Sequence, residues 1–205
     1  MSNAPQTLTV MESNRLLDEL LRDTGTIKQK ALGIRNYLMG LLMLDAGLRV
    51  GEVVKQQVDS LYFAAEPVQT LVLTKRMAKN HTPRTVPTSQ RIRHAIESMN
   101  NHIWQKSPCD NCNVAFRNIS THQPITTRQV ERIIRKASLA SIGRPVHPHV
   151  LRHTFASRLM RTVNIRIVQE LLGHKSISST QIYTHPNQED LKKAIGSLEK
   201  NPDES

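Results

Sequence analysis

The sequence predicts a mainly helical domain with a small antiparallel β-sheet, an α+β fold. Most of the chain carries apolar residues at the three- and four-residue spacing typical of amphipathic helices. Two short runs, Val68 to Leu73 and Thr85 to Val86, have the composition of strands instead. The polar and basic segment between them, residues 74–84, is typical of a hairpin connection, so these two runs are expected to pair.

Two helices are expected at the start of the chain. Thr9 and Glu12 form the pattern of a capping box, which marks the beginning of a helix. A longer helix from about Ile27 to Ala46 should end at Gly47, because glycine accepts the left-handed conformation of a helix C-cap. Arg49 follows on the turn between two packed helices, where a ligand-binding arginine would be held in place. Taken alone, it fits a surface arginine that caps a helix end better.

Further helices are expected from about Ser89 to Trp104 and after a cap at Thr126 or Thr127. The second of these carries a basic stripe opposite an apolar one. Such a stripe either faces solvent or belongs to a helix that lies along or in a DNA groove. Its basic residues are Arg128, Arg132, Arg135 and Lys136.

The charge of the chain indicates a polyanionic partner. The formal net charge is +11, and residues 185–205 carry more acidic than basic side chains, so the positive charge belongs to the body. Aromatic residues make up only 3%, which disfavours single-strand binding by base stacking and favours duplex DNA held by its phosphates. The hairpin adds the further DNA-binding candidates Lys75, Arg76 and Arg84.

One region gathers the residues that could perform chemistry. His149 and Arg152 are three positions apart, so on a helix they share one face. A second apolar-periodic run ends at Gly173, a residue suited to a left-handed helix C-cap, and His174 follows directly at the turn. Tyr183 lies nine residues further on. A single buried histidine or tyrosine is more often a core residue with its hydrogen bonds satisfied, but here the whole set occurs in order.

These motifs resemble the catalytic boxes of the tyrosine recombinases, the integrase family. The family pattern H-x-L-R-H-x-x-A stands at His149 to Ala156, and L-L-G-H stands at Leu171 to His174, followed by Tyr183. The pattern A-G-L-R-x-[SG]-E stands at Ala46 to Glu52. The resemblance implies the catalytic-domain fold of that family, in which the arginine of this last motif contacts the scissile phosphate and Glu52 supports the site.

The resemblance also implies a catalytic lysine on the hairpin. Lys79, eight residues before Pro87, occupies the position of the first lysine in G-K-G-x-K-x-R-x-V-P. Ala78 and Asn80 replace the usual glycines, so Lys75 remains a competitor for the role. An exposed hairpin lysine that touches only the DNA backbone is the remaining alternative.

The implied reaction is transesterification at a phosphodiester. The Tyr183 phenol attacks phosphorus, and the energy of the broken bond is conserved in a 3′-phosphotyrosine. Arg49 and Arg152 stabilise the charge of the phosphate oxygens, and His174 donates a hydrogen bond to one of them. His149 takes the proton from the phenol or returns it, and the lysine protonates the departing 5′ hydroxyl. No metal or cofactor is expected, because side chains supply the positive charge.

The resemblance covers about Leu8 to Ser197, so residues 1–200 are expected to form one catalytic domain, with a disordered tail at 201–205. The N-terminal core-binding domain found in most of the family is expected to be absent. The family implies a monomer in solution that forms a tetramer on paired DNA sites, and a helix at about Glu189 to Leu198 is expected to contact a neighbour or its own domain. The expected location is cytoplasmic and nucleoid-associated, without membrane contact.

Three other functions are alternatives on the sequence alone: a type IB topoisomerase, a non-catalytic DNA-binding protein and a metal-dependent nuclease. The second is disfavoured because no catalytic residue is missing, and the third because the sequence has no cluster of carboxylates to hold Mg²⁺. The topoisomerase would relax supercoils without recombining sites, and the nuclease would require divalent ions. Cys109 and Cys112 form a Cys-x-x-Cys pair, which fits a solvent-near loop better than half of a zinc site, because no second cysteine pair exists.

Overall fold

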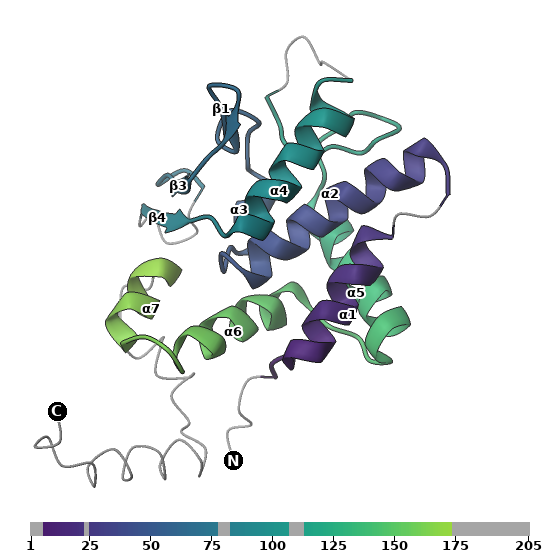
Figure 1. Ribbon diagram of the computed structural model, residues 1–205. Coiled ribbons are helices and arrows are strands. Elements are labelled where there is room, and N and C mark those ends of the chain that lie inside the picture. The colour runs from purple at the N-terminus through teal and green to yellow at the C-terminus, as the bar shows by residue number, and fades with distance from the viewer. Residues whose placement is uncertain (1–5, 23–24, 78–82, 107–112, 174–205) are drawn as a thin grey trace, which may run out of the picture.

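The computed structural model describes residues 6–22, 25–77, 83–106 and 113–173 (Figure 1). In these residues helices predominate, and the strands form two small antiparallel sheets, which confirms the predicted fold class. The elements are α1 (Val10–Leu21), α2 (Ile27–Leu44), α3 (Val50–Val53), β1 (Tyr62–Phe63), β2 (Glu66–Pro67), β3 (Thr70–Leu73), β4 (Arg84–Pro87), α4 (Gln90–Met99), the π-helix η1 (Asn100–Trp104), α5 (Thr127–Ile142), α6 (Pro148–Leu159) and α7 (Ile165–Leu172).

Helix α2 forms the centre of the domain. Its C-terminal half is buried on every side, with Leu38, Met39 and Leu41 to Met43 all 0% exposed. A helix that is apolar all round requires neighbours all round. Helices α1, α4 and α6 pack against it, and α5 packs on α1 (Figure 1). The turn after α2 therefore follows a helix end that is fully buried.

The helix ends follow the local sequence signals. The Thr9 hydroxyl accepts a hydrogen bond from the Glu12 N–H at 3.1 Å, and the Glu12 carboxylate accepts one from the Thr9 N–H at 2.8 Å, as predicted for a capping box. Thr126, rather than Thr127, caps α5. Helix α2 ends at Leu44, two residues before the expected Ala46, and Gly47 takes the left-handed conformation with φ 63°.

The helix expected from Ser89 to Trp104 changes its hydrogen-bond pattern on the way. It is α-helical only to Met99 and then continues as the wider π-helix η1. At its end the Trp104 indole donates to the Ala115 carbonyl oxygen at 3.0 Å, which ties the helix to the following loop.

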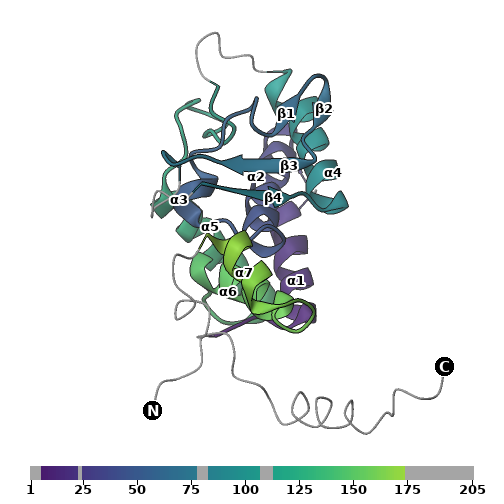
Figure 2. The same ribbon diagram turned by 90° about the vertical axis from the view of Figure 1, so that its left-hand side faces the viewer.

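The two predicted β-runs pair as strands β3 and β4. Leu71 lies opposite Val86 and Leu73 opposite Arg84, and these four side chains face the interior. Figure 2 shows the two strands side by side across the helical body, with α7 next to β4, which it contacts. The shorter β1–β2 pair was not predicted, because its turn residues Ala64 and Ala65 both have positive φ without a glycine or asparagine to signal it.

A close helix crossing at Gly33 gives a test of this packing. A Cβ atom at Gly33 would lie 1.9 Å from the Leu21 carbonyl oxygen, so Gly33→Ala must push α1 and α2 apart. We expect the substitution to lower the free energy of unfolding by about 1–3 kcal/mol, measured by urea denaturation.

Gly51→Ala is the matched control, because a Cβ atom there meets nothing within 4 Å. In a helix this change should raise stability by roughly 0.5–1 kcal/mol. Equal stability of the two variants would show that α1 and α2 leave room for a Cβ atom at Gly33, contrary to the close contact with Leu21.

Candidate active site

A buried carboxylate, that of Glu52, lies at the centre of the candidate site. Its side chain is 1% exposed and sits in the short helix α3, for which Arg49 is the N-cap. The Arg49 N–H donates to Glu52 Oε2 at 2.8 Å, and Arg49 Nη1 donates to Oε1 at 3.1 Å. The first predicted arginine and its supporting acid are therefore in direct contact.

Two more arginines approach the same carboxylate from other elements. Arg84 of β4 donates from Nη1 to Glu52 Oε1 at 2.9 Å and from Nη2 to Oε2 at 2.7 Å, the bidentate geometry in which arginine binds carboxylates most strongly. Nη1 of Arg152, on α6, lies 4.0 Å from Oε2. Elements α3, β4 and α6 thus meet at one negative charge.

The protonation state of Glu52 follows from these contacts. Burial raises the pKa of its carboxyl, but the hydrogen bonds and charge of Arg84, the Arg49 N–H and the charge of Arg152 together hold the pKa below its ordinary value. Glu52 is therefore ionised at neutral pH. An ionised buried carboxylate keeps the arginine side chains that face it in a fixed arrangement.

Arg152 is itself held by two backbone carbonyls. Its Nη1 donates to the Gly47 oxygen, and its Nη2 donates to the Leu172 oxygen at 2.8 Å. Gly47 is required here for two reasons: its φ is +63°, and a Cβ atom would lie 2.3 Å from the Phe155 ring on α6. The turn that follows α2 therefore packs directly against the helix that carries Arg152.

The side chains at the candidate site differ in their access to solvent. The Arg49 side chain is 17% exposed and that of Arg152 6%, whereas His149, one helical turn before Arg152, is exposed. His153 is half-buried, and burial together with His149 and Arg152 lowers the pKa of its imidazole. Arg49 and His149 are thus accessible to a ligand from outside.

Three of the predicted catalytic residues lie outside the described residues: Lys79, His174 and Tyr183. Their roles therefore stay predictions. Helix α7 ends at Gly173, directly before His174, with the expected left-handed φ of 62°. The remaining DNA-binding candidates are all exposed: Lys75, Arg76, Arg128, Arg132, Arg135 and Lys136.

Arg84 differs from its predicted role. It was expected to contact DNA from an exposed hairpin, but the residue is 7% exposed and its guanidinium is bound to Glu52. The signal that could have revealed the burial of Arg84 is the period of two in a strand, since Arg84 shares the inward face with Val86. The buried position makes it a structural partner of the site rather than a surface contact.

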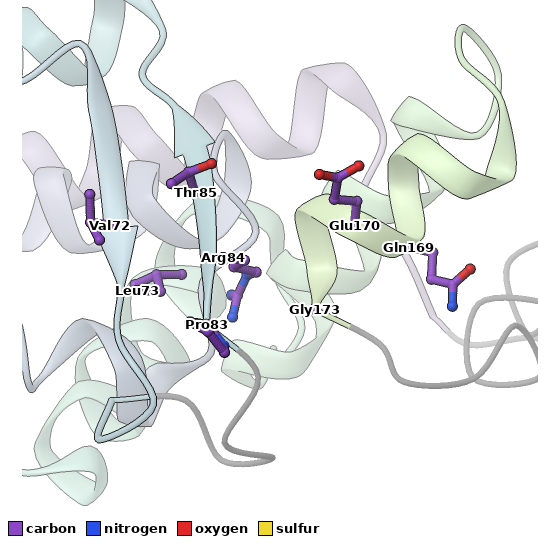
Figure 3. Close-up of a pocket in the computed structure, with 8 residues that line it drawn as sticks. All are labelled: Val72, Leu73, Pro83, Arg84, Thr85, Gln169, Glu170 and Gly173. Carbon is purple, nitrogen blue, oxygen red and sulfur yellow. The ribbon is translucent and has the colours of Figure 1, made fainter.

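A cleft of about 380 Å³ lies beside this cluster, between the β3–β4 hairpin and α7. Figure 3 shows the Arg84 side chain between strand β4 and Gly173, with Gln169 and Glu170 contributed by α7. In the described part of the chain, no group of three or more His, Cys, Asp or Glu side chains is placed to hold a metal ion. No helix there is long and apolar enough to span a membrane.

Removing the charge of Glu52 tests whether its arginine contacts hold the site together. Glu52→Gln keeps the shape but leaves Arg84 buried without its counterion. The free energy of unfolding at pH 7 should therefore fall by about 3–5 kcal/mol. The folded-state pKa of Glu52 lies below the ordinary 4.5, so the charged pair contributes above about pH 4.5 and is lost as pH falls through the folded pKa.

Glu12→Gln is the control for this substitution. Glu12 pairs with Arg144 where both side chains are about a quarter exposed, and glutamine still completes the capping box. Its cost should be about 0–1 kcal/mol. Similar costs for the two variants would show that the Glu52 cluster is no stronger than a surface ion pair.

Comparison with known proteins identifies the family to which this chain is similar. The model of the phage integrase family matches residues 6–190. The chain is 34% identical over 182 residues to the tyrosine recombinase XerC of Azotobacter vinelandii, covering 88% of this chain and 56% of that protein. The chain therefore spans just over half the length of this relative.

Solved structures agree with the family match. The crystal structure of XerA recombinase superimposes with a TM-score of 0.75 at 26% identity, covering 97% of this chain and 67% of that one. XerH site-specific recombinase, bound to a palindromic difH substrate in a post-cleavage complex, gives a TM-score of 0.67 at 25% identity, covering 97% of this chain and 54% of that one. The chain, with its arginine cluster around Glu52, belongs to the phage integrase family of tyrosine recombinases.

Proposed function

We propose that this chain is the catalytic domain of a site-specific DNA recombinase that cleaves and rejoins duplex DNA through a 3′-phosphotyrosyl intermediate. The observation that carries the proposal is the convergence of Arg49 and Arg152 on the buried carboxylate of Glu52. Arg49 is the N-cap of α3 and Arg152 lies on α6, where the carbonyl oxygens of Gly47 and Leu172 also hold its guanidinium. The family match, which extends to residue 190, includes Tyr183.

In the proposed reaction the Tyr183 phenolic oxygen attacks the scissile phosphorus, and the bond from phosphorus to the 5′ oxygen breaks. His149 accepts the phenol proton, and Lys79 donates a proton to the leaving 5′ oxygen. Arg49 and Arg152 stabilise the negative charge on the non-bridging oxygens, with His174 as a further donor. The exchange conserves the number of phosphate ester bonds, so attack by a 5′ hydroxyl reverses it without an energy source.

Duplex DNA is the proposed substrate. The exposed Lys75 and Arg76 next to the hairpin, and the basic stripe of α5, supply cations for backbone phosphates. The XerH relative was solved on a DNA substrate. We propose further that residues 1–200 act as one domain, monomeric in solution and tetrameric on paired sites, in the cytoplasm near the nucleoid.

A nicked suicide substrate, which loses the 5′-hydroxyl strand after cleavage, tests the function directly. The chain should form a protein–DNA adduct that survives SDS, and Tyr183→Phe should form none while binding duplex DNA as before. Mapping the adduct by peptide mass spectrometry identifies the attacking residue.

Tyr62→Phe serves as the matched control. The Tyr62 hydroxyl donates to the Ala65 carbonyl oxygen at 2.8 Å in the β1–β2 hairpin, and its loss should leave adduct formation intact. An adduct that persists in Tyr183→Phe would disprove the assignment of the nucleophile. Absence of an adduct in the unmodified chain, despite DNA binding, would favour a non-catalytic DNA-binding role.

A further inference from the structure

One buried side chain, that of Arg84, connects three elements of the candidate site. Its backbone belongs to β4, its two terminal nitrogens bind Glu52 on α3, and its Nε donates to the Leu171 carbonyl oxygen in the last turn of α7 at 2.8 Å. We propose that Arg84 is a positioning residue that fixes β4 and the end of α7 relative to Arg49 and Glu52. This inference rests on the proposed function and adds to it a residue that acts without touching DNA.

The geometry requires arginine at this position. The Arg84 side chain is 3% exposed, and its three nitrogens donate to three different acceptors. A planar guanidinium supplies parallel donors for the carboxylate and a separate Nε donor at a fixed angle, whereas a lysine ammonium is a single point of charge. Lysine can therefore preserve the charge at this site but cannot make the same set of contacts.

The aliphatic part of Arg84 also contacts α7. A Cβ atom at Gly173 would lie 3.0 Å from the Arg84 Cδ, so the end of α7 rests against this side chain. Figure 3 shows Arg84 extending from β4 toward Gly173 along the cleft that separates the hairpin from α7. The side chain therefore spans the space between these two elements.

Neighbouring carbonyls at the end of α7 bind two arginines of the cluster. Leu171 accepts from Arg84, and Leu172 accepts from Arg152 at 2.8 Å. The C-terminal carbonyls of a helix carry partial negative charge and bind cations well. Because both arginines also face Glu52, a shift of Arg84 would alter the position of α7 and the arrangement of the Glu52 carboxylate together.

Along the chain, the elements that Arg84 joins lead into the other predicted catalytic residues. Lys79 precedes Arg84 by five residues, and His174 follows Leu171 by three. A displacement of about 1 Å in a catalytic group can lower a rate by roughly 10²-fold. Loss of Arg84 is therefore expected to slow cleavage without removing a group that contacts the substrate.

The variants Arg84→Met and Arg84→Lys test the proposal, with Arg91→Met as the matched control. Arg91 makes a bidentate pair with Asp45 at 2.8 Å, but its side chain is 47% exposed and lies outside the site. In single-turnover cleavage of the suicide substrate, both Arg84 variants should be slower by on the order of 10²-fold. Their duplex affinity should stay close to that of the unmodified chain, and Arg91→Met should match the unmodified chain in both assays.

A double-mutant cycle with Glu52→Gln separates positioning from direct contact. If Arg84 acts through Glu52, the double variant Glu52→Gln/Arg84→Met should lose much less cleavage rate than the product of the two single losses. Independent losses that multiply would show that Arg84 does not act through Glu52, and a fall in duplex affinity parallel to the fall in cleavage would show that it contacts DNA itself. Either result would overturn the proposal.

Amide hydrogen exchange tests the same proposal without any need for catalysis. Arg84→Lys should exchange faster than the unmodified chain in both β3–β4 (residues 70–73 and 84–87) and α7 (residues 165–172), and Arg91→Met should not. Unchanged exchange in α7 would overturn the positioning role. If the unmodified chain forms no covalent adduct, the proposed function fails, while the exchange comparison still decides whether Arg84 holds these elements together.

Discussion

The negative charge of Glu52 is the constraint on which the site depends. A buried, ionised carboxylate costs several kcal/mol unless positive groups and hydrogen-bond donors surround it. Here Arg49, Arg84 and Arg152 approach it from α3, β4 and α6. The carboxylate is therefore stabilised by residues from three segments of the chain, around positions 49, 84 and 152. Those segments are the ones that carry the predicted catalytic motifs.

The rest of the fold provides rigid support for this cluster. Buried α2 leads into Gly47, whose carbonyl oxygen binds Arg152 and whose lack of a side chain admits the Phe155 ring. At the end of α7, the carbonyl oxygens of Leu171 and Leu172 accept hydrogen bonds from Arg84 and Arg152. Groups that must stabilise charge in a transition state work best when they are already in place. Backbone carbonyls and a buried carboxylate hold Arg152 in place in this way, as its proposed role requires.

The sequence predicted the features that depend on local patterns. The capping box at Thr9, the hairpin strands and the left-handed Gly173 were all predicted because a few neighbouring residues determine them. The π-helix at Asn100 was not predicted, since its apolar spacing does not differ from that of an α-helix. In the site, the motifs identified Glu52 and Arg152, but no local pattern shows that Arg84, 32 positions from Glu52, shares its carboxylate. Contacts of this kind depend on the tertiary fold.

The pKa of Glu52 is the most direct measurement of the central claim. In the chain labelled with ¹³C at glutamate carboxyl groups, an NMR titration follows each carboxyl separately, and Glu52→Gln assigns its signal. The arginine cluster predicts that the Glu52 pKa lies below its ordinary value of 4.5 despite the burial, and that it rises in Arg84→Met. A Glu52 pKa above 4.5 in the unmodified chain would show that burial outweighs the arginines and would contradict the account.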